Sequence, residues 1–282
     1  MSVAGGLPFA VARARIHRCE ALQVFTKNAT QWRARPLPAD EIAAFRKAVI
    51  DAGIAPVVSH ASYLINLAST SPALHAQSIA ALGEEVDRAE ALGLLGVVLH
   101  PGARMGAPVD EAIARITGAL TQVLKARRRG KTMILLEHTA GQGSTMGSTF
   151  EEIAAMLDGV RNTARLGVCL DTCHLLASGY DLCTEEGYRR TFTVFEDLIG
   201  FDRLKVFHLN DSKKPCMSRV DRHEHIGQGC IGIEPFRRLL NDTRFSHLPM
   251  IIETEKSESK GRRVEVDVLD DMNLTTLRGL LR

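Results

Sequence analysis

The 282-residue sequence lacks any apolar run long enough to cross a bilayer, and it has no positively charged start followed by an apolar segment. Acidic and basic residues nearly cancel, leaving a formal net charge of +2, so no global positive charge points to nucleic acid. The six cysteines include no CxxC pair, which argues against a disulfide framework and favours a reducing compartment. We therefore expect a soluble intracellular protein that does not bind membranes, located in the cytoplasm or nucleoid, or in a eukaryotic nucleus.

Nucleotide-binding loops and internal repeats are also missing, since the Gly-rich stretch Thr139-Ala-Gly-Gln-Gly143 lacks the spacing of a phosphate-binding loop. What the chain does contain is an alternation of short apolar runs and longer helical patterns. The apolar runs span 21–25, 55–60, 96–100, 132–137, 166–171, 204–208 and 249–253, and the helical patterns span 8–20, 39–52, 72–92, 109–128, 149–160, 184–199, 234–241 and 271–282. Strands separated by helices pair in parallel through right-handed crossovers. The pattern predicts an α/β fold with one domain over residues 1–282, a TIM-type (β/α)8 barrel whose first strand is missing or truncated.

Six of the seven apolar runs end in a histidine or an acidic residue. These strand-end residues are His60, His100, Glu137, Asp171, His208 and Glu253. The run Leu166-Gly-Val-Cys-Leu-Asp-Thr-Cys-His174 adds an imidazole three residues after its acid, before the turn-like Ala177-Ser-Gly-Tyr-Asp181. Taken alone, Asp171 could cap the next helix and His174 could be a hydrogen-bonded core histidine. Repetition at strand after strand instead favours a metal or acid–base site on the carboxyl face of the barrel.

Two loop segments carry further candidates. The polar run from residue 211 to 229 would usually be a solvated loop, but the alternate spacing of Asp221 and His223 lets both side chains point to one side of an extended segment. This spacing suits two ligands of one metal. The segment Ala61-Ser-Tyr-Leu-Ile-Asn-Leu67 follows a strand and offers either an apolar wedge for a partner or side chains that simply pack beneath the loop.

Together these motifs resemble the endonuclease IV family of apurinic/apyrimidinic (AP) endonucleases. The matching segments are Ser62-Tyr-Leu-Ile-Asn-Leu67, His100-Pro-Gly102, Glu137-His-Thr-Ala-Gly-Gln-Gly143, Gly167-Val-Cys-Leu-Asp-Thr-Cys-His174, Gly179-Tyr-Asp181, His208-Leu-Asn-Asp211, Ser218-Arg-Val-Asp-Arg-His223 and Ile252-Glu-Thr254. They extend over nearly the whole chain, and the combination is highly specific. The resemblance implies a TIM-type barrel that carries three zinc ions (Zn2+) on its carboxyl face.

Carried over residue by residue, the resemblance implies three metal sites. His60 and His100 would hold the first zinc, and the catalytic Glu137 would bridge it to the second. The remaining ligands would be Asp171, His208 and Glu253 for the second zinc, and His174, Asp221 and His223 for the third. Imidazole and carboxylate donors suit zinc, whereas oxygen donors alone would suit magnesium.

The resemblance also implies the reaction and the substrate. The enzyme would be a zinc-dependent deoxyribonuclease of base excision repair that binds double-stranded DNA containing abasic sites. It would hydrolyse the phosphodiester 5′ of the abasic site, leaving a 3′ hydroxyl and a 5′ deoxyribose phosphate, and it would also remove 3′-blocking groups. Because metal ions neutralise the phosphate and activate water, no protein nucleophile is required. We expect a monomer.

DNA recognition would rest on loops of the same face. We expect Gln31, Tyr63 and Leu64 to form a wedge that fills the gap left by the absent base, because an abasic nucleotide costs less to flip out than a paired one. The expected phosphate contacts are Lys27, Arg33, Lys213, Lys214, Arg219 and Arg222.

The sequence departs from the family pattern at three places, and two alternative functions are compatible with it. Only three residues precede Ala4-Gly-Gly-Leu7, where the family has a histidine-containing strand, so either the start is misplaced or the barrel is open at that edge. Thr30 stands where the family commonly has arginine, and His138 where asparagine is usual. One alternative function is a metal-dependent sugar isomerase or epimerase on a related barrel, which would need no third metal cluster. The other is an inactive DNA-binding relative.

Overall fold

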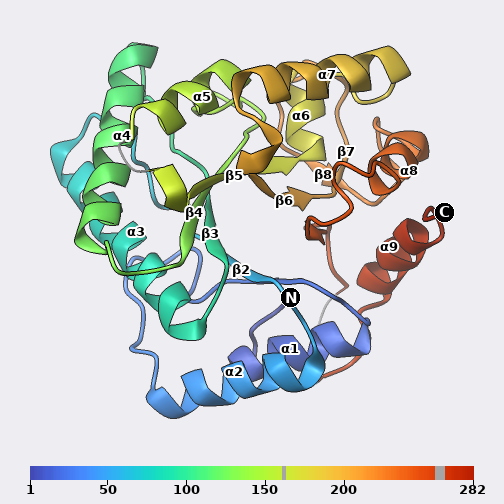
Figure 1. Cartoon of the computed structure of the whole chain (residues 1–282), viewed down its shortest axis with the longest axis horizontal. Helices are drawn as coiled ribbons and strands as arrows, with labels where there is room; N and C mark the ends of the chain where they lie inside the picture. Colours follow the sequence, from blue (N-terminus) through green and yellow to red (C-terminus); the bar gives the residue numbers. More distant parts are fainter. Residues whose placement is uncertain (161–162, 258–263) are drawn as a thin grey trace.

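The computed structural model describes residues 1–160, 163–257 and 264–282. Its centre is a sheet of seven parallel strands that curves into a barrel with helices around its outside (Figure 1). In their order across the sheet, the strands are β1 (Leu22–Val24), β2 (Val57–His60), β3 (Gly96–Leu99), β4 (Met133–Glu137), β5 (Leu166–Asp171), β6 (Leu204–His208) and β9 (Met250–Ile251). Each strand lies within a run predicted from the sequence, and the predicted TIM-type barrel is confirmed.

Eight helices correspond to the helical patterns of the sequence. They are α1 (Leu7–Ile16), α2 (Ala39–Ala52), α3 (Pro72–Leu92), α4 (Val109–Ala126), α5 (Phe150–Asp158), α7 (Glu185–Leu198), α8 (Ile233–Leu240) and α9 (Val268–Arg278). Local chemistry explains several of their ends, since the side chains of Ser71, Thr149 and Thr184 accept hydrogen bonds from the first turns of α3, α5 and α7. None of the described helices is long and apolar enough to span a membrane.

A short helix and a two-stranded hairpin near the carboxyl face were not predicted. The sequence indicated a turn after His174, but residues Thr172–Ser178 form a short helix, α6, which ends at Gly179 in the left-handed conformation (φ 108°). Beyond β6, β7 (Asp211–Ser212) pairs antiparallel with β8 (His223–Glu224). Both elements are too short to impose a detectable periodicity on the sequence.

The barrel has one open seam, between β1 and β9. These strands are the first and last in the sheet order, and no ladder joins them within the described part of the chain. A cavity of about 410 Å³ lies at the seam, lined by residues of both edges, including Leu22 and Met250. The N-terminal ammonium of Met1 donates a hydrogen bond of 2.9 Å to the carbonyl oxygen of Gln23. The sheet is therefore a nearly closed parallel barrel with one unsealed seam.

Apolar side chains fill both faces of the sheet. Most of the core lies between the strands and the surrounding helices, where large side chains such as Phe150, Phe192 and Phe207 are fully buried. A second, smaller cluster occupies the barrel interior, with one residue from each of five neighbouring strands: Val58, Val98, Leu135, Cys169 and Val206. This interior layer closes the barrel below its carboxyl face.

Candidate metal centre

The side chains of the site form the next interior layer above this apolar cluster. Because side chains alternate along a strand, the residue two places after an interior residue also points into the barrel. The successive pairs are Val58 and His60, Val98 and His100, Leu135 and Glu137, Cys169 and Asp171, Val206 and His208, and Ile251 and Glu253. One strand period therefore brings six donors from six strands to the same end of the barrel.

The first group of donors is His60, His100 and Glu137. The Nε2 atoms of His60 and His100 lie 3.1 and 3.0 Å from Oε2 of Glu137. The other ring nitrogen of His60, Nδ1, donates to the carbonyl oxygen of Ala61 at 2.8 Å. This hydrogen bond fixes the ring and directs Nε2 toward the carboxylate of Glu137.

The second group comprises Glu137, Asp171, His208 and Glu253, whose ligand atoms lie within 4.8 Å of one another. Nδ1 of His208 is 2.9 Å from Oε1 of Glu137 and 3.1 Å from Oε2 of Glu253. Glu137 thus presents one carboxylate oxygen to the first group and the other to the second. Its side chain is fully buried at the centre of the site.

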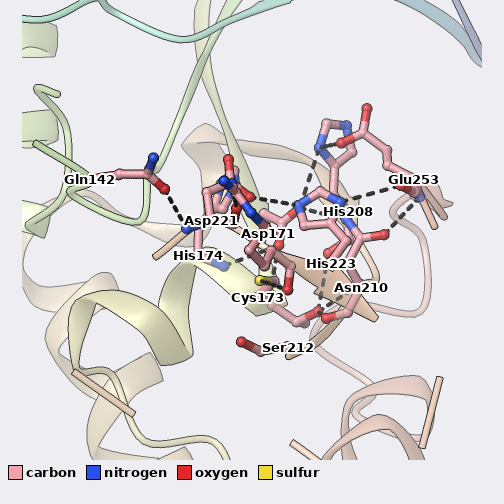
Figure 2. A network of polar contacts seen from close by, with 12 residues as sticks. Gln142, Asp171, Cys173, His174, His208, Asn210, Ser212, Asp221, His223 and Glu253 are labelled. Carbon is pink, nitrogen blue, oxygen red and sulfur yellow. Dashed lines mark hydrogen bonds and ion pairs between the residues drawn. The ribbon is translucent and has the colours of Figure 1, made fainter. Parts of the chain in front are cut away.

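The third group is built on α6 and the β7–β8 hairpin, as Figure 2 shows. The carboxylate of Asp171 accepts hydrogen bonds from the backbone N–H groups of Cys173 and His174, so it caps α6 and places His174 in the site. Asp171, His174 and His223 have donor atoms within 4.8 Å of one another. Asp221 joins them, since its two oxygens lie 3.1 Å from Nε2 of His174 and 3.2 Å from Nε2 of His223.

Mutual proximity of opposite charges shifts the pKa values of these groups. Burial alone would raise the pKa of Glu137, but the positive charges of His100 and His208 and their hydrogen bonds hold it well below its usual range. Burial likewise opposes the charged form of His174, yet Asp171 and Asp221 raise the pKa of its imidazole to about 10. The carboxylate of Glu137 is therefore ionised, and the surrounding imidazoles and carboxylates favour positive charge at the centre of the site.

Two buried imidazole nitrogens of the third group lack a hydrogen-bond partner, as expected for metal ligands. Nε2 of His174 and Nε2 of His223 are buried and make no hydrogen bond, although both face the carboxylate of Asp221. Buried polar atoms normally have a hydrogen-bond partner, so this arrangement suits nitrogens that share a cation with the carboxylates. The thiols of Cys169 and Cys173 also lie beside these donors, and burial raises the pKa of each to about 12.

The comparisons with known proteins agree with this geometry. A family model described as a xylose isomerase-like TIM barrel matches residues 11–272. A probable endonuclease 4 of Chloroflexus aurantiacus is 46% identical over 282 residues, which cover 100% of this chain and 96% of that protein. The chain belongs to the endonuclease IV family of AP endonucleases.

Two solved structures place this member of the endonuclease IV family within its fold. Endonuclease IV from Thermus thermophilus matches with a TM-score of 0.86 and 34% identity, covering 99% of this chain and 96% of that one. A D-psicose 3-epimerase matches with a TM-score of 0.69 and 15% identity, covering 97% of this chain and 91% of that one. At such low identity, the likeness to the epimerase shows the shared barrel alone.

Several residues that hold the donors were not singled out by the sequence. Asn210 donates from Nδ2 to Asp171 at 2.6 Å and accepts at Oδ1 from the backbone N–H of Glu253 at 2.7 Å. Gln23 contacts both Glu253 and His208. A signal was available for both, because Gln23 is a carboxamide within an apolar strand and Asn210 is a carboxamide two residues beyond one.

The asparagine expected by the endonuclease IV pattern is replaced by His138, which is buried beside Glu137. Burial lowers the pKa of His138 to about 3, so its imidazole is neutral. One ring nitrogen lies 3.2 Å from the carbonyl oxygen of Ser148. The backbone carbonyl of His138 accepts a hydrogen bond of 2.8 Å from Nδ1 of His174, so this position orients a residue of the third group.

The predicted wedge residues lie in loops on the carboxyl side of the barrel. Tyr63 is 61% exposed, and its ring centroid lies 5.4 Å from that of His60 and 6.3 Å from that of His100. Gln31 is exposed in the loop after β1, and Leu64 is half-buried. Tyr63 therefore covers the first donor group from the solvent side.

The predicted phosphate contacts divide into two kinds. The exposed cations are Arg33, Lys213, Lys214, Arg219 and Arg222. Lys27 is buried. Its ammonium donates to the carbonyl oxygen of Trp32 at 3.1 Å and lies 3.8 Å from the carboxylate of Glu85. It stabilises the loop after β1 from within, so we remove Lys27 from the expected phosphate contacts.

Proposed function

We propose that this chain is a zinc-dependent AP endonuclease of base excision repair, acting as a monomer with one barrel domain over residues 1–282. It hydrolyses the phosphodiester 5′ of an abasic site in double-stranded DNA, leaving a 3′ hydroxyl and a 5′ deoxyribose phosphate, and it also removes 3′-blocking groups. The observation that carries the proposal is the sharing of carboxylates among three adjacent donor groups. Glu137 belongs to the first and second groups, and Asp171 to the second and third.

The donor groups support three zinc sites. His60, His100 and Glu137 would hold the first ion, and Glu137, Asp171, His208 and Glu253 the second. His174, Asp221 and His223 would hold the third, with Asp171 close to both imidazoles of that site. The mixture of imidazole and carboxylate donors is the set that zinc prefers.

The chemistry divides between the metal and the chain. Bound zinc supplies positive charge that stabilises a phosphodiester and activates water for attack. The chain keeps the donors ionised and oriented, and Glu137 acts as the catalytic bridge because its two oxygens face different donor groups. Burial raises the pKa of the Cys169 and Cys173 thiols to about 12, which disfavours the thiolate that nucleophilic attack by cysteine would need.

Surface features around the centre support binding of a damaged duplex. A cavity of about 210 Å³ opens beside the donors and is lined by residues including His100, Gln142 and Arg222. We propose that the sugar–phosphate of an abasic nucleotide enters here while Tyr63, Leu64 and Gln31 fill the gap it leaves in the duplex. The exposed cations Arg33, Lys213, Lys214, Arg219 and Arg222 would contact the flanking phosphates.

The alternatives make different predictions. A sugar epimerase on the same barrel would have no use for the third donor group around Asp221, which favours the nuclease. An inactive relative would bind abasic DNA without metal-dependent turnover.

The experiment is cleavage of a duplex that contains one stable abasic analogue, with an otherwise identical intact duplex as the control. We expect a single cut 5′ of the lesion, with a 3′ end that a polymerase extends, and loss of cleavage in chelator with recovery when zinc is restored. Cleavage of both duplexes alike, or binding without any cut in zinc, would contradict the proposal.

A further inference from the structure

Gln23 is an unusual residue for its position. It lies in the three-residue strand β1 between Leu22 and Val24, at the open seam, and the residue is only 6% exposed. Its flanking residues pack in the outer core, so alternation turns Gln23 into the barrel interior. An amide buried there costs free energy unless both of its ends find hydrogen-bond partners.

Both ends of the amide are bound to residues of the second donor group. Nε2 of Gln23 lies 2.5 Å from Oε1 of Glu253, and Oε1 of Gln23 lies 2.9 Å from Nε2 of His208. An ionised carboxylate only accepts hydrogen bonds, so the amide nitrogen must face Glu253 and the amide oxygen must face the imidazole. That oxygen also only accepts, and Nε2 of His208 must therefore carry a proton.

The fixed proton on Nε2 determines which ring nitrogen of His208 can bind metal. Nδ1 faces Glu137 and Glu253, at 2.9 and 3.1 Å, and it is the nitrogen left for the ion. His60 and His174 are oriented the other way, since each donates from Nδ1 to a backbone carbonyl and presents Nε2 to the site. His208 thus depends on a side chain where the other two depend on the backbone.

We propose that Gln23 is a positioning residue that sets the tautomer of His208 and the rotation of the Glu253 carboxylate across the open seam. This inference rests on the proposed zinc centre and concerns its second site. No ladder joins β1 to β9 in the described residues, so the amide supplies the fixed link between these edges that backbone pairing supplies elsewhere. Partners that orient metal ligands in this way typically contribute about 10- to 100-fold in metal affinity.

Two substitutions separate the hydrogen bonds from the packing. Gln23→Met keeps a side chain of similar length, but it cannot donate to Glu253 and offers His208 only a weakly accepting sulfur. Gln23→Glu keeps an acceptor for His208 but cannot donate to Glu253. The matched control is Gln122→Met, which makes the same change at an exposed position of α4. Circular dichroism and thermal unfolding would confirm that each variant is folded.

The first readout is zinc affinity, measured by competition with a chromogenic chelator. We expect Gln23→Met to release one of three ions about 10- to 100-fold more readily than wild type, while the other two ions and the Gln122→Met control are unchanged. The second readout is the nitrogen NMR spectrum of the His208 ring in the zinc-loaded protein. We expect a proton on Nε2 that exchanges slowly in wild type and Gln23→Glu but rapidly in Gln23→Met.

The outcomes distinguish this inference from the proposed function. Equal zinc affinity in wild type and Gln23→Met, or a His208 proton found on Nδ1, would overturn the role of Gln23 while leaving the zinc centre intact. A wild-type chain that binds no zinc would overturn the centre itself, and this inference with it. If Gln23→Met does not fold, Gln23→Glu carries both readouts, with His208 protected and zinc affinity reduced.

Discussion

The two sides of the barrel hold their metal donors by different means. From β2 to β6, parallel ladders fix the strand ends that carry His60, Glu137, Asp171 and His208, with one register shift between Val168 and Cys169. At the seam, β9 has only two residues and Glu253 lies beyond them. There, carboxamide side chains hold the donor: Asn210 binds its backbone N–H, and Gln23 binds its carboxylate.

This difference shows what a metal site requires of its scaffold. Backbone pairing fixes the strand that carries a donor through many hydrogen bonds. Side-chain changes on the paired side should therefore matter little unless they remove a donor or a direct hydrogen-bond partner of a donor, as Asn210 is of Asp171. At the seam, where no ladder joins β1 to β9 in the described residues, the side-chain amide of Gln23 links the two edges. Removal of this amide should loosen Glu253 without unfolding the barrel. Variants on the two sides therefore separate the loss of a donor from the loss of its support.

The largest effect should come from the paired side, at the donor shared by two groups. We expect Glu137→Gln to reduce cleavage of abasic DNA by on the order of 10³-fold or more, because the bridge loses its charge. DNA binding should stay close to wild type, since the phosphate grip is spread over several loops. Single-turnover cleavage and a binding titration measure the two effects, and near-normal cleavage would show that the bridge lies elsewhere.

A smaller effect is expected at the seam from Asn210→Leu, which has a similar volume but cannot bind Asp171 or the Glu253 backbone. Zinc affinity should fall about 10- to 100-fold, because two donors lose a fixed partner. Chelator competition measures this change, and unaltered affinity would show that the strands alone hold both donors. Because the amide is buried, thermal unfolding of the zinc-free variant should be followed in parallel.

The third prediction concerns pH in the zinc-free protein. Despite burial, neighbouring carboxylates raise the pKa of His174 to about 10 and that of His223 to about 9, so their contribution to stability is complete below pH 6.5 and is lost as pH rises through 9 to 10. Burial would raise the pKa of Glu253, but His208 lowers it to about 2, so its contribution is present above pH 4.5 and is lost as pH falls toward 2.

Thermal unfolding of the zinc-free protein between pH 3 and 11 tests this prediction. The melting temperature should be highest between about pH 4.5 and 6.5, and it should fall both at lower and at higher pH. Asp221→Asn should reduce the alkaline loss, because it removes a carboxylate that raises both imidazole pKa values. An alkaline limb that is identical in wild type and Asp221→Asn would contradict the assigned cause.

The smallest effects should come from the loops above the centre. Tyr63→Ala should reduce discrimination between abasic and intact duplex with little change in the salt dependence of binding. The paired variant Lys213→Gln with Lys214→Gln should flatten the salt slope by roughly one unit for each phosphate that is no longer neutralised, with discrimination preserved. Binding titrations at several salt concentrations distinguish the two effects. If Tyr63→Ala changed the salt slope and the lysine variant changed discrimination, the assigned roles of these residues would be wrong.

Many of the donor residues could be predicted because short stretches of sequence determine where their side chains point. A two-residue strand period and a strand end place His60, Glu137 and His208 on one face whatever the rest of the chain does. Asp171 shows that the bland and the functional interpretations of a residue can both hold, since it caps α6 and also belongs to two donor groups.

The features that were missed depend on contacts between distant segments. Lys27 reads as an exposed loop cation, and only the folded chain brings Glu85 of α3 against it. Gln23 reads as an isolated polar residue in an apolar run, and its partners lie on strands at the other end of the chain. The meeting of Asp221 with His174 likewise required the family resemblance, because spacing alone left the polar loop free to be solvated.

The most direct test of the account is the zinc content of the protein purified without chelator. The three linked donor groups predict about three zinc ions per chain, measured by elemental analysis against protein concentration from amino-acid analysis. Asp221→Asn should lower that number to about two, because it affects the third group alone. A content near one ion in the wild type, or magnesium in place of zinc, would contradict the trinuclear centre.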